Sequence, residues 1–86
     1  NSSKNKSLSN ARISVVLTNQ PGSLGKITTV IAKNNGNISN INFSIRKIDF
    51  FEIIIDIEVR DANHLQNIIA ALRLVSEVSS LERIKG

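Results

Sequence analysis

Polar and apolar residues alternate along several stretches of the chain. A period of two is typical of strands that bury one face, and it predicts strands over Ala11–Thr18, Asn37–Lys47 and Phe51–Arg60. A fourth stretch, Val78–Ile84, alternates less regularly, as expected for a strand that has a bulge or lies at a sheet edge. The short break between the second and third strands predicts an antiparallel hairpin.

Two amphipathic helices are predicted between these strands. Residues at i, i+3, i+4 and i+7 form one stripe in each helix. The stripes are Leu24, Ile27, Thr28 and Ile31 in the first helix, and Leu65, Ile68, Ile69 and Leu72 in the second. Pro21 and Gly22 break the chain before the first helix, and Gly36 suits the left-handed position that ends it. Asp61 is suited to cap the second helix.

The element order predicts an α+β fold of the ferredoxin-like βαββαβ type. Right-handed crossovers place both helices on one face of a four-stranded antiparallel sheet. The other face is expected to be open and to carry Ser14, Val16, Asn42, Ser44, Ile54, Asp56 and Glu58. Residues 1–10 are polar with a single apolar residue, and we expect them to form a flexible linker or arm. Residues 11–86 are then the single folded domain.

Composition narrows the possible chemistry. The 86 residues include no Cys, Met, Trp or Tyr, so we expect an aliphatic core and no disulfide, haem or iron–sulfur chemistry. The net charge of +4 is concentrated at Lys4, Lys6 and Arg12, and the rest of the chain is nearly neutral, which supports a polyanion partner only weakly. The sequence contains neither a long apolar run nor a leader pattern. We therefore expect a cytoplasmic protein without membrane contact, and the first residue, Asn1, suggests a piece of a longer protein.

The residues that could carry catalysis do not form a recognisable set. His64 is the only histidine, and we expect it to be solvated on a helix surface. Asp56 and Glu58 lack the third oxygen-rich segment that a cation site needs. Phe43 and Phe51 fall on the apolar face, so we expect them in the core rather than stacked on RNA bases. The sequence thus predicts no catalytic residue, no metal site and no cofactor.

The turn before the first helix is the best candidate for a binding site. Free backbone N–H groups at a helix start favour a carboxylate. The amides of Asn19 and Asn37 could hold the carboxylate and ammonium of an amino acid, beside apolar side chains. The candidate site comprises Asn19, Gln20, Pro21, Gly22, Ser23, Leu24, Asn37 and Ile38. In the alternative interpretation these residues only make the turn and start the next strand, and the residues alone favour that one.

The segment ISVVLTNQPGSLGKITTVIAKNNGNISNINF resembles the ACT domain pattern of a strand, a Pro-Gly turn, a helix and an Asn-Ile pair. The second half, with IEVRD, HLQNIIAAL and a final ERI, resembles the C-terminal ACT domain of the bifunctional Rel/SpoT-type GTP pyrophosphokinases of the stringent response. The motif residues that match are Pro21, Gly22, Asn37 and Ile38. Asn19-Gln20 stands where Asp-Arg is frequent, and Ser23 and Gly25 replace bulkier residues.

The resemblance implies a regulatory module rather than an enzyme. Such modules form dimers side by side and often bind an amino acid between the copies. In the stringent-response enzymes they control distant ppGpp synthetase and hydrolase domains, through branched-chain amino acids in some members and through ribosome and ribosomal RNA contacts. We therefore expect a homodimer that senses a small aliphatic amino acid. The alternatives are a protein or ribosome interaction module without a small ligand, or a module that only dimerises.

Overall fold

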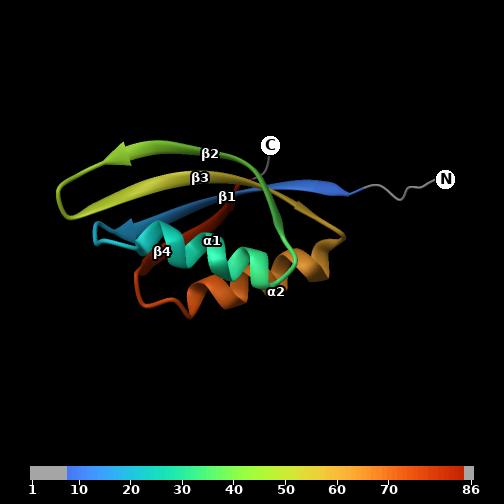
Figure 1. The fold of residues 1–86 in the computed structure, drawn as a ribbon. Coiled ribbons are helices and arrows are strands. Elements are labelled where there is room, and N and C mark those ends of the chain that lie inside the picture. Colours follow the sequence, from blue (N-terminus) through green and yellow to red (C-terminus); the bar gives the residue numbers. More distant parts are fainter. Residues whose placement is uncertain (1–7, 85–86) are drawn as a thin grey trace.

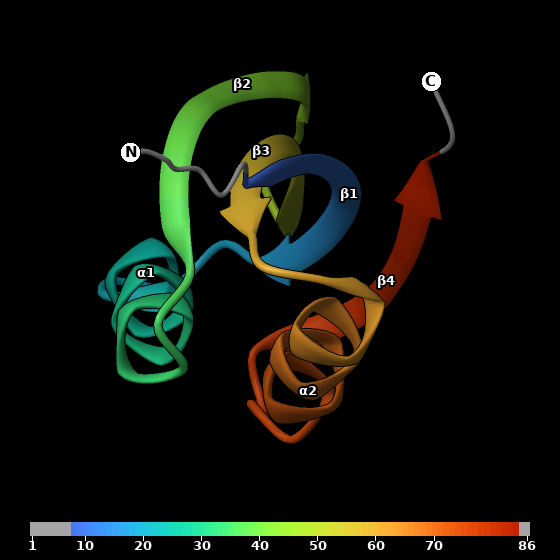
Figure 2. The ribbon, with the colours of Figure 1, turned by 90° about the vertical axis from the view of Figure 1, so that its right-hand side faces the viewer.

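The computed structural model describes residues 8–84 and has six elements in the predicted order. They are β1 (Ser9–Thr18), α1 (Ser23–Lys33), β2 (Asn37–Arg46), β3 (Phe50–Val59), α2 (Ala62–Arg73) and β4 (Val78–Ile84). The strands form one antiparallel sheet in the order β2-β3-β1-β4, and both helices lie on one face of it (Figure 1). The predicted ferredoxin-like architecture is confirmed. Figure 2 shows α1 and α2 beneath the strongly twisted sheet, whose other face they leave uncovered.

The core lies between the sheet and the helices, and its fully buried apolar residues are all aliphatic. Odd-numbered residues of β1 and β3 meet the helix stripes, as the alternation predicts. The side chains with no exposed surface include Ile13, Val15, Leu17, Ile27, Ile31, Ile53, Ile55, Ile57, Ile68 and Leu72. Burying one such side chain contributes roughly 1.5–3 kcal/mol, so the two helices are held mainly by this layer.

The boundaries of the first strand and the first helix differ from prediction in two respects. β1 begins at Ser9, two residues before the predicted start of the strand. Residues 1–7 of the predicted arm lie outside the described residues. The left-handed residue after α1 is Asn35, with φ 66°, and not Gly36. Gly36 donates its N–H to the carbonyl of Ile31 and lies where a side chain has no room. Close packing, rather than a positive φ, therefore requires glycine at this position.

His64 is buried, which corrects the expectation of a solvated imidazole. It is 5% exposed in the first turn of α2, where its backbone N–H donates to the capping carboxylate of Asp61. Its Nδ1 accepts the N–H of Arg60, and its Nε2 lies 2.7 Å from the carbonyl oxygen of Asn34 at the end of α1. With Nδ1 as acceptor, Nε2 carries the proton and donates. The imidazole therefore links the two helices.

β2 is an edge strand whose pairing with β3 shifts register twice. The shifts lie between Ile38 and Asn40 and between Phe43 and Ile45, as β-bulges produce. After the second shift Ile45 lies opposite Glu52, a residue of the open face. The alternation that places odd-numbered residues of β2 on the core face therefore ends before Ile45. Phe43 is 46% exposed, which corrects its assignment to the core, because an open cavity rather than packed side chains lies between it and the start of α1.

Candidate functional site

The turn between β1 and α1 leaves the start of the helix open. Gly22 is the N-cap with φ 84°, a left-handed conformation that glycine adopts without strain, and it offers no capping side chain. Ser23 is buried, and its Oγ donates to the carbonyl of Thr18 at 2.9 Å. The hydroxyl thereby folds the turn back onto the end of β1. The first turn of α1 contains no acidic residue, so its positive end is not neutralised from within.

Asn19 ties this turn to the hairpin between β2 and β3. Its Nδ2 donates to the carbonyl of Ile48 at 3.0 Å and more weakly to that of Lys47 at 3.4 Å. Its backbone N–H donates to the carbonyl of Asp49 at 2.9 Å. The amide nitrogen that the sequence offered to a ligand is therefore already used, and the side-chain oxygen remains available to accept a hydrogen bond.

The turn and the hairpin together form the walls of an open cavity of about 290 Å³. Five of the predicted site residues line it, namely Asn19, Gln20, Gly22, Ser23 and Leu24. The other lining residues are Gly25 from α1 and Phe43, Arg46, Lys47 and Phe51 from the hairpin. The hairpin residues were missed from the sequence, because only the pairing of β2 with β3 and the contact of Asn19 with the hairpin bring them to the turn.

Asn37 and Ile38 do not reach this cavity in the same chain. The Nδ2 of Asn37 donates to Oε1 of Glu58 at 2.8 Å, at the opposite end of β2 from Arg46. Ten extended residues at about 3.3 Å each separate the two ends by roughly 30 Å. A single chain therefore does not bring Asn19 and Asn37 together around one small molecule.

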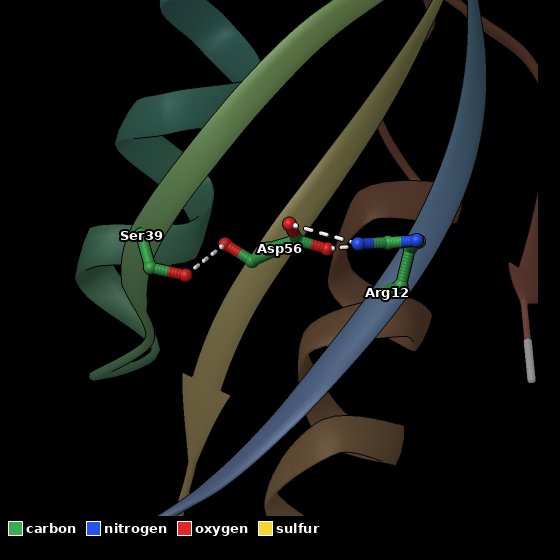
Figure 3. Close-up of polar contacts among 3 residues, drawn as sticks. All are labelled: Arg12, Ser39 and Asp56. Carbon is green, nitrogen blue, oxygen red and sulfur yellow. Dashed lines mark hydrogen bonds and ion pairs between the residues drawn. The ribbon is translucent and has the colours of Figure 1, made fainter. Parts of the chain in front are cut away.

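The open face of the sheet holds a second polar cavity, of about 550 Å³. There Asp56 of β3 lies between Arg12 of β1 and Ser39 of β2 (Figure 3). Arg12 Nε donates to the Asp56 carboxylate at 2.7 Å, and Ser39 Oγ donates to the Asp56 backbone carbonyl at 3.3 Å. The hydrogen bond from Arg12 holds the pKa of the Asp56 carboxyl below its usual value. The charges of Arg12 and Asp56 thus balance each other, and Arg83 adds a further positive charge to the lining.

Other carboxylates line the same face along β3. Glu52 accepts hydrogen bonds from Ser44 and Ser14, and these bonds lower the pKa of its carboxyl. Glu58 is held by Asn37. The row is acidic, as predicted from the sequence, and it disfavours the docking of a phosphate backbone on this face.

Two further classes of site are not found in the described part of the chain. Within residues 8–84, no group of three or more His, Cys, Asp or Glu residues is arranged to hold a metal ion. Neither helix in that range combines the length and apolar character needed to cross a bilayer.

Comparison with known sequences identifies the family. Residues 6–83 match the model of the ACT domain. The chain is 47% identical over 76 residues to the GTP pyrophosphokinase rsh of Brucella suis biovar 1 (strain 1330), an alignment that covers 88% of this chain and 10% of that protein. The chain therefore spans about a tenth of the length of the curated relatives it matches.

Solved structures agree with this assignment. The crystal structure of the ACT domain from the GTP pyrophosphokinase of Chlorobium tepidum has a TM-score of 0.77 and 29% identity, covering 91% of this chain and 100% of that one. The acetolactate synthase small subunit of Thermotoga maritima has the same TM-score at 20% identity, covering 90% of this chain and 48% of that one, and shows a likeness of fold alone. By its sequence and its fold, this chain belongs to the ACT domain family, as a regulatory domain similar to that of the GTP pyrophosphokinases.

Proposed function

We propose that this domain binds a small aliphatic amino acid, with a branched chain favoured, at a site shared between two copies. Binding then controls catalytic domains elsewhere in a longer cytoplasmic parent, a GTP pyrophosphokinase that makes and degrades ppGpp. The observation that carries the proposal is the cavity beside the open start of α1, where Gly22 leaves backbone N–H groups uncapped. The 47% identity to a GTP pyrophosphokinase supports the choice of parent.

The separation of Asn37 from the turn supports a dimer. The outer edge of β2 extends over ten residues without proline, and such an edge is a template for another strand. If the β2 strands of two copies pair antiparallel about a two-fold axis, the start of one strand lies beside the end of the other. Asn37 of one copy then lies near Arg46 and the cavity of its partner. The dimer thereby brings together the two halves of the predicted site.

The alternative role, docking on ribosomal RNA, receives less support. The carboxylates of Glu52, Asp56 and Glu58 occupy the open face that such docking would use. The basic residues that favoured it, Lys4 and Lys6, lie outside the described residues. We therefore do not propose the open face as an RNA-binding surface.

Calorimetric titration with valine, isoleucine, leucine and serine tests the proposal, together with sedimentation to establish the dimer. We expect saturable heat with at least one branched-chain amino acid. Asn37→Ala should weaken binding more than it lowers stability, whereas Asn67→Ala, an exposed change on α2 and outside the β2 edge, should alter binding little. No heat with any of the four at millimolar concentration, or a monomer at all concentrations, contradicts the shared site.

A further inference from the structure

The cavity beside the turn receives two basic side chains, Arg46 and Lys47, from the end of β2. The turn before α1 and its first residues, from Asn19 to Gly25, contain neither Lys nor Arg, so the sequence alone indicates a neutral turn. The hydrogen bonds from Asn19 to the hairpin carbonyls place both cations at the start of α1.

These cations are not neutralised within the described chain. The ion pairs among residues 8–84 are Arg12–Asp56 and Lys26–Glu77, and neither includes Arg46 or Lys47. None of the residues that line the cavity is acidic. The uncapped start of α1 adds a partial positive charge on the same side. Cavity, hairpin and helix end therefore act together to attract an anion.

The apolar side of the cavity limits which anion fits. The rings of Phe43 and Phe51 pack with their centroids 5.6 Å apart. Leu24 lines the same cavity, and about half of the surface of Phe43 is free to be covered. The guanidinium carbon of Arg46 lies 4.8 Å from the centroid of the Phe43 ring, a cation–π contact that fixes the cation beside the apolar surface. A cation beside an apolar surface fits a small ligand that carries one carboxylate and one apolar group a few bonds from it.

We propose that Arg46 is the residue that holds the carboxylate of the ligand, while the apolar part of the ligand packs on Phe43 and Phe51. This inference rests on the proposed function and adds the basis of its selectivity. The ligand class is a small carboxylic acid with an apolar side chain. The cavity residues include no acidic partner for an ammonium group, which leaves the neutral amide oxygens of Asn19 and of the partner's Asn37 to accept from it. The corresponding 2-oxo acid, which keeps the carboxylate, should therefore still bind through Arg46.

Three probes separate these contributions in titrations of the protein. Valine carries both charges, 3-methyl-2-oxobutanoate lacks the ammonium group, and valinamide lacks the carboxylate. We expect the first two to bind and valinamide to bind at least about tenfold more weakly, as the loss of a charge-assisted hydrogen bond predicts. Arg46→Gln should lower the affinity for valine and for 3-methyl-2-oxobutanoate by about tenfold or more, and Arg46→Lys should lower both affinities by less. Lys33→Gln, at the far end of α1, removes the same charge and should change affinity by less than about twofold.

The outcomes distinguish this inference from the proposed function. If valine binds wild-type protein and folded Arg46→Gln equally, the carboxylate anchor is wrong and amino-acid binding stands. Equal binding of valinamide and valine overturns the anchor in the same way. If the 2-oxo acid binds through Arg46 and valine does not, the anchor stands and the amino-acid sensor falls. If neither carboxylate binds at millimolar concentration, both are wrong. Melting temperatures of the variants identify any loss of binding caused by unfolding.

Discussion

The side-chain nitrogen of Asn19 lies 3.0 Å from the carbonyl oxygen of Ile48, and this bond joins the turn before α1 to the tip of the β2–β3 hairpin. The two residues are 29 positions apart in the sequence. The bond sets how far the hairpin stands from the helix start, and hence the width of the cavity between them. The side chain that the motif offers to a ligand thus shapes the site rather than donating into it.

Asn19→Ala should therefore affect both stability and binding. The loss of an exposed hydrogen bond predicts about 0.5–1.5 kcal/mol lower free energy of unfolding in urea. Because the hairpin is then free to move away, the affinity for valine should fall by a larger factor than stability alone explains. Asn67→Ala, at an exposed position of α2, is the matched control. Unchanged affinity in Asn19→Ala would show that the hairpin does not shape the cavity.

Alanine substitutions of Gly36 and Gly25 should change the free energy of unfolding in opposite directions. A Cβ on Gly36 would lie 2.8 Å from both Ile31 Cγ2 and Ile68 Cδ1, whereas a Cβ on Gly25 would meet nothing within 4 Å. Gly36→Ala should cost roughly 1–3 kcal/mol as an overpacked core. Gly25→Ala should raise stability by up to about 1 kcal/mol, since alanine favours the helix. Urea unfolding of both variants checks the pair, and a stabilised Gly36→Ala would contradict the described packing.

Truncating the imidazole of His64 should loosen the contact between the helices. His64→Ala leaves the carbonyl of Asn34 and the N–H of Arg60 without their partner, and we expect a loss of roughly 1–3 kcal/mol in the free energy of unfolding. His64→Phe restores the volume but not the hydrogen bonds, so it should recover only part of the loss. Hydrogen exchange should accelerate most at the end of α1 and the start of α2. Full recovery in the phenylalanine variant would mean that packing alone matters there.

The architecture could be predicted from the sequence because the alternation and the helix stripes are local signals, and the buried residues of β1 and β3 repeat the alternation without interruption. The role of His64 could not be predicted, since the carbonyl oxygen of Asn34 to which it bonds lies 30 positions away in the sequence and becomes adjacent only when the helices pack. The same holds for Arg46, which enters the site through strand pairing and bulges. Gly36 was predicted as the left-handed cap, whereas the structure requires glycine there for close packing. A sequence alone does not distinguish these two reasons for a glycine at the end of a helix.

Stability should depend on pH through the carboxylates of the open face. The hydrogen bond from Arg12 lowers the pKa of Asp56, and those from Ser44 and Ser14 lower the pKa of Glu52. A carboxyl whose pKa is lower in the folded state contributes stability that is present above its unfolded value and lost as pH falls through its folded value. The free energy of unfolding should therefore decline as pH falls below about 4.

The variant Asp56→Asn isolates one contribution to this decline. The asparagine side chain does not take up a proton in this range, so the stability of the variant should fall less than that of the wild type between about pH 6 and pH 2. Asp49→Asn at the hairpin tip removes the same charge at an exposed position and serves as the control. Urea midpoints measured across this range compare the three proteins. Parallel profiles for wild type and Asp56→Asn would contradict a contribution from the Arg12 pair.

The sharing of one site between two copies is tested by a mixed dimer. Gly25→Asp places a carboxylate at the open start of α1, where there is space for it and where it suits the helix end, and it should repel a bound carboxylate. Asn37→Ala removes the contribution expected from the other copy. Each variant alone should bind valine poorly in both sites of its own dimer.

The decisive measurement is the valine-binding capacity of an equimolar mixture of Gly25→Asp and Asn37→Ala after subunit exchange. In a mixed dimer, one site combines both substitutions and the other combines two unaltered halves. If the turn of one chain and Asn37 of its partner form one site, about a quarter of the wild-type capacity should return at wild-type affinity. If the mixture binds no more than the separate variants, the site does not span the two subunits.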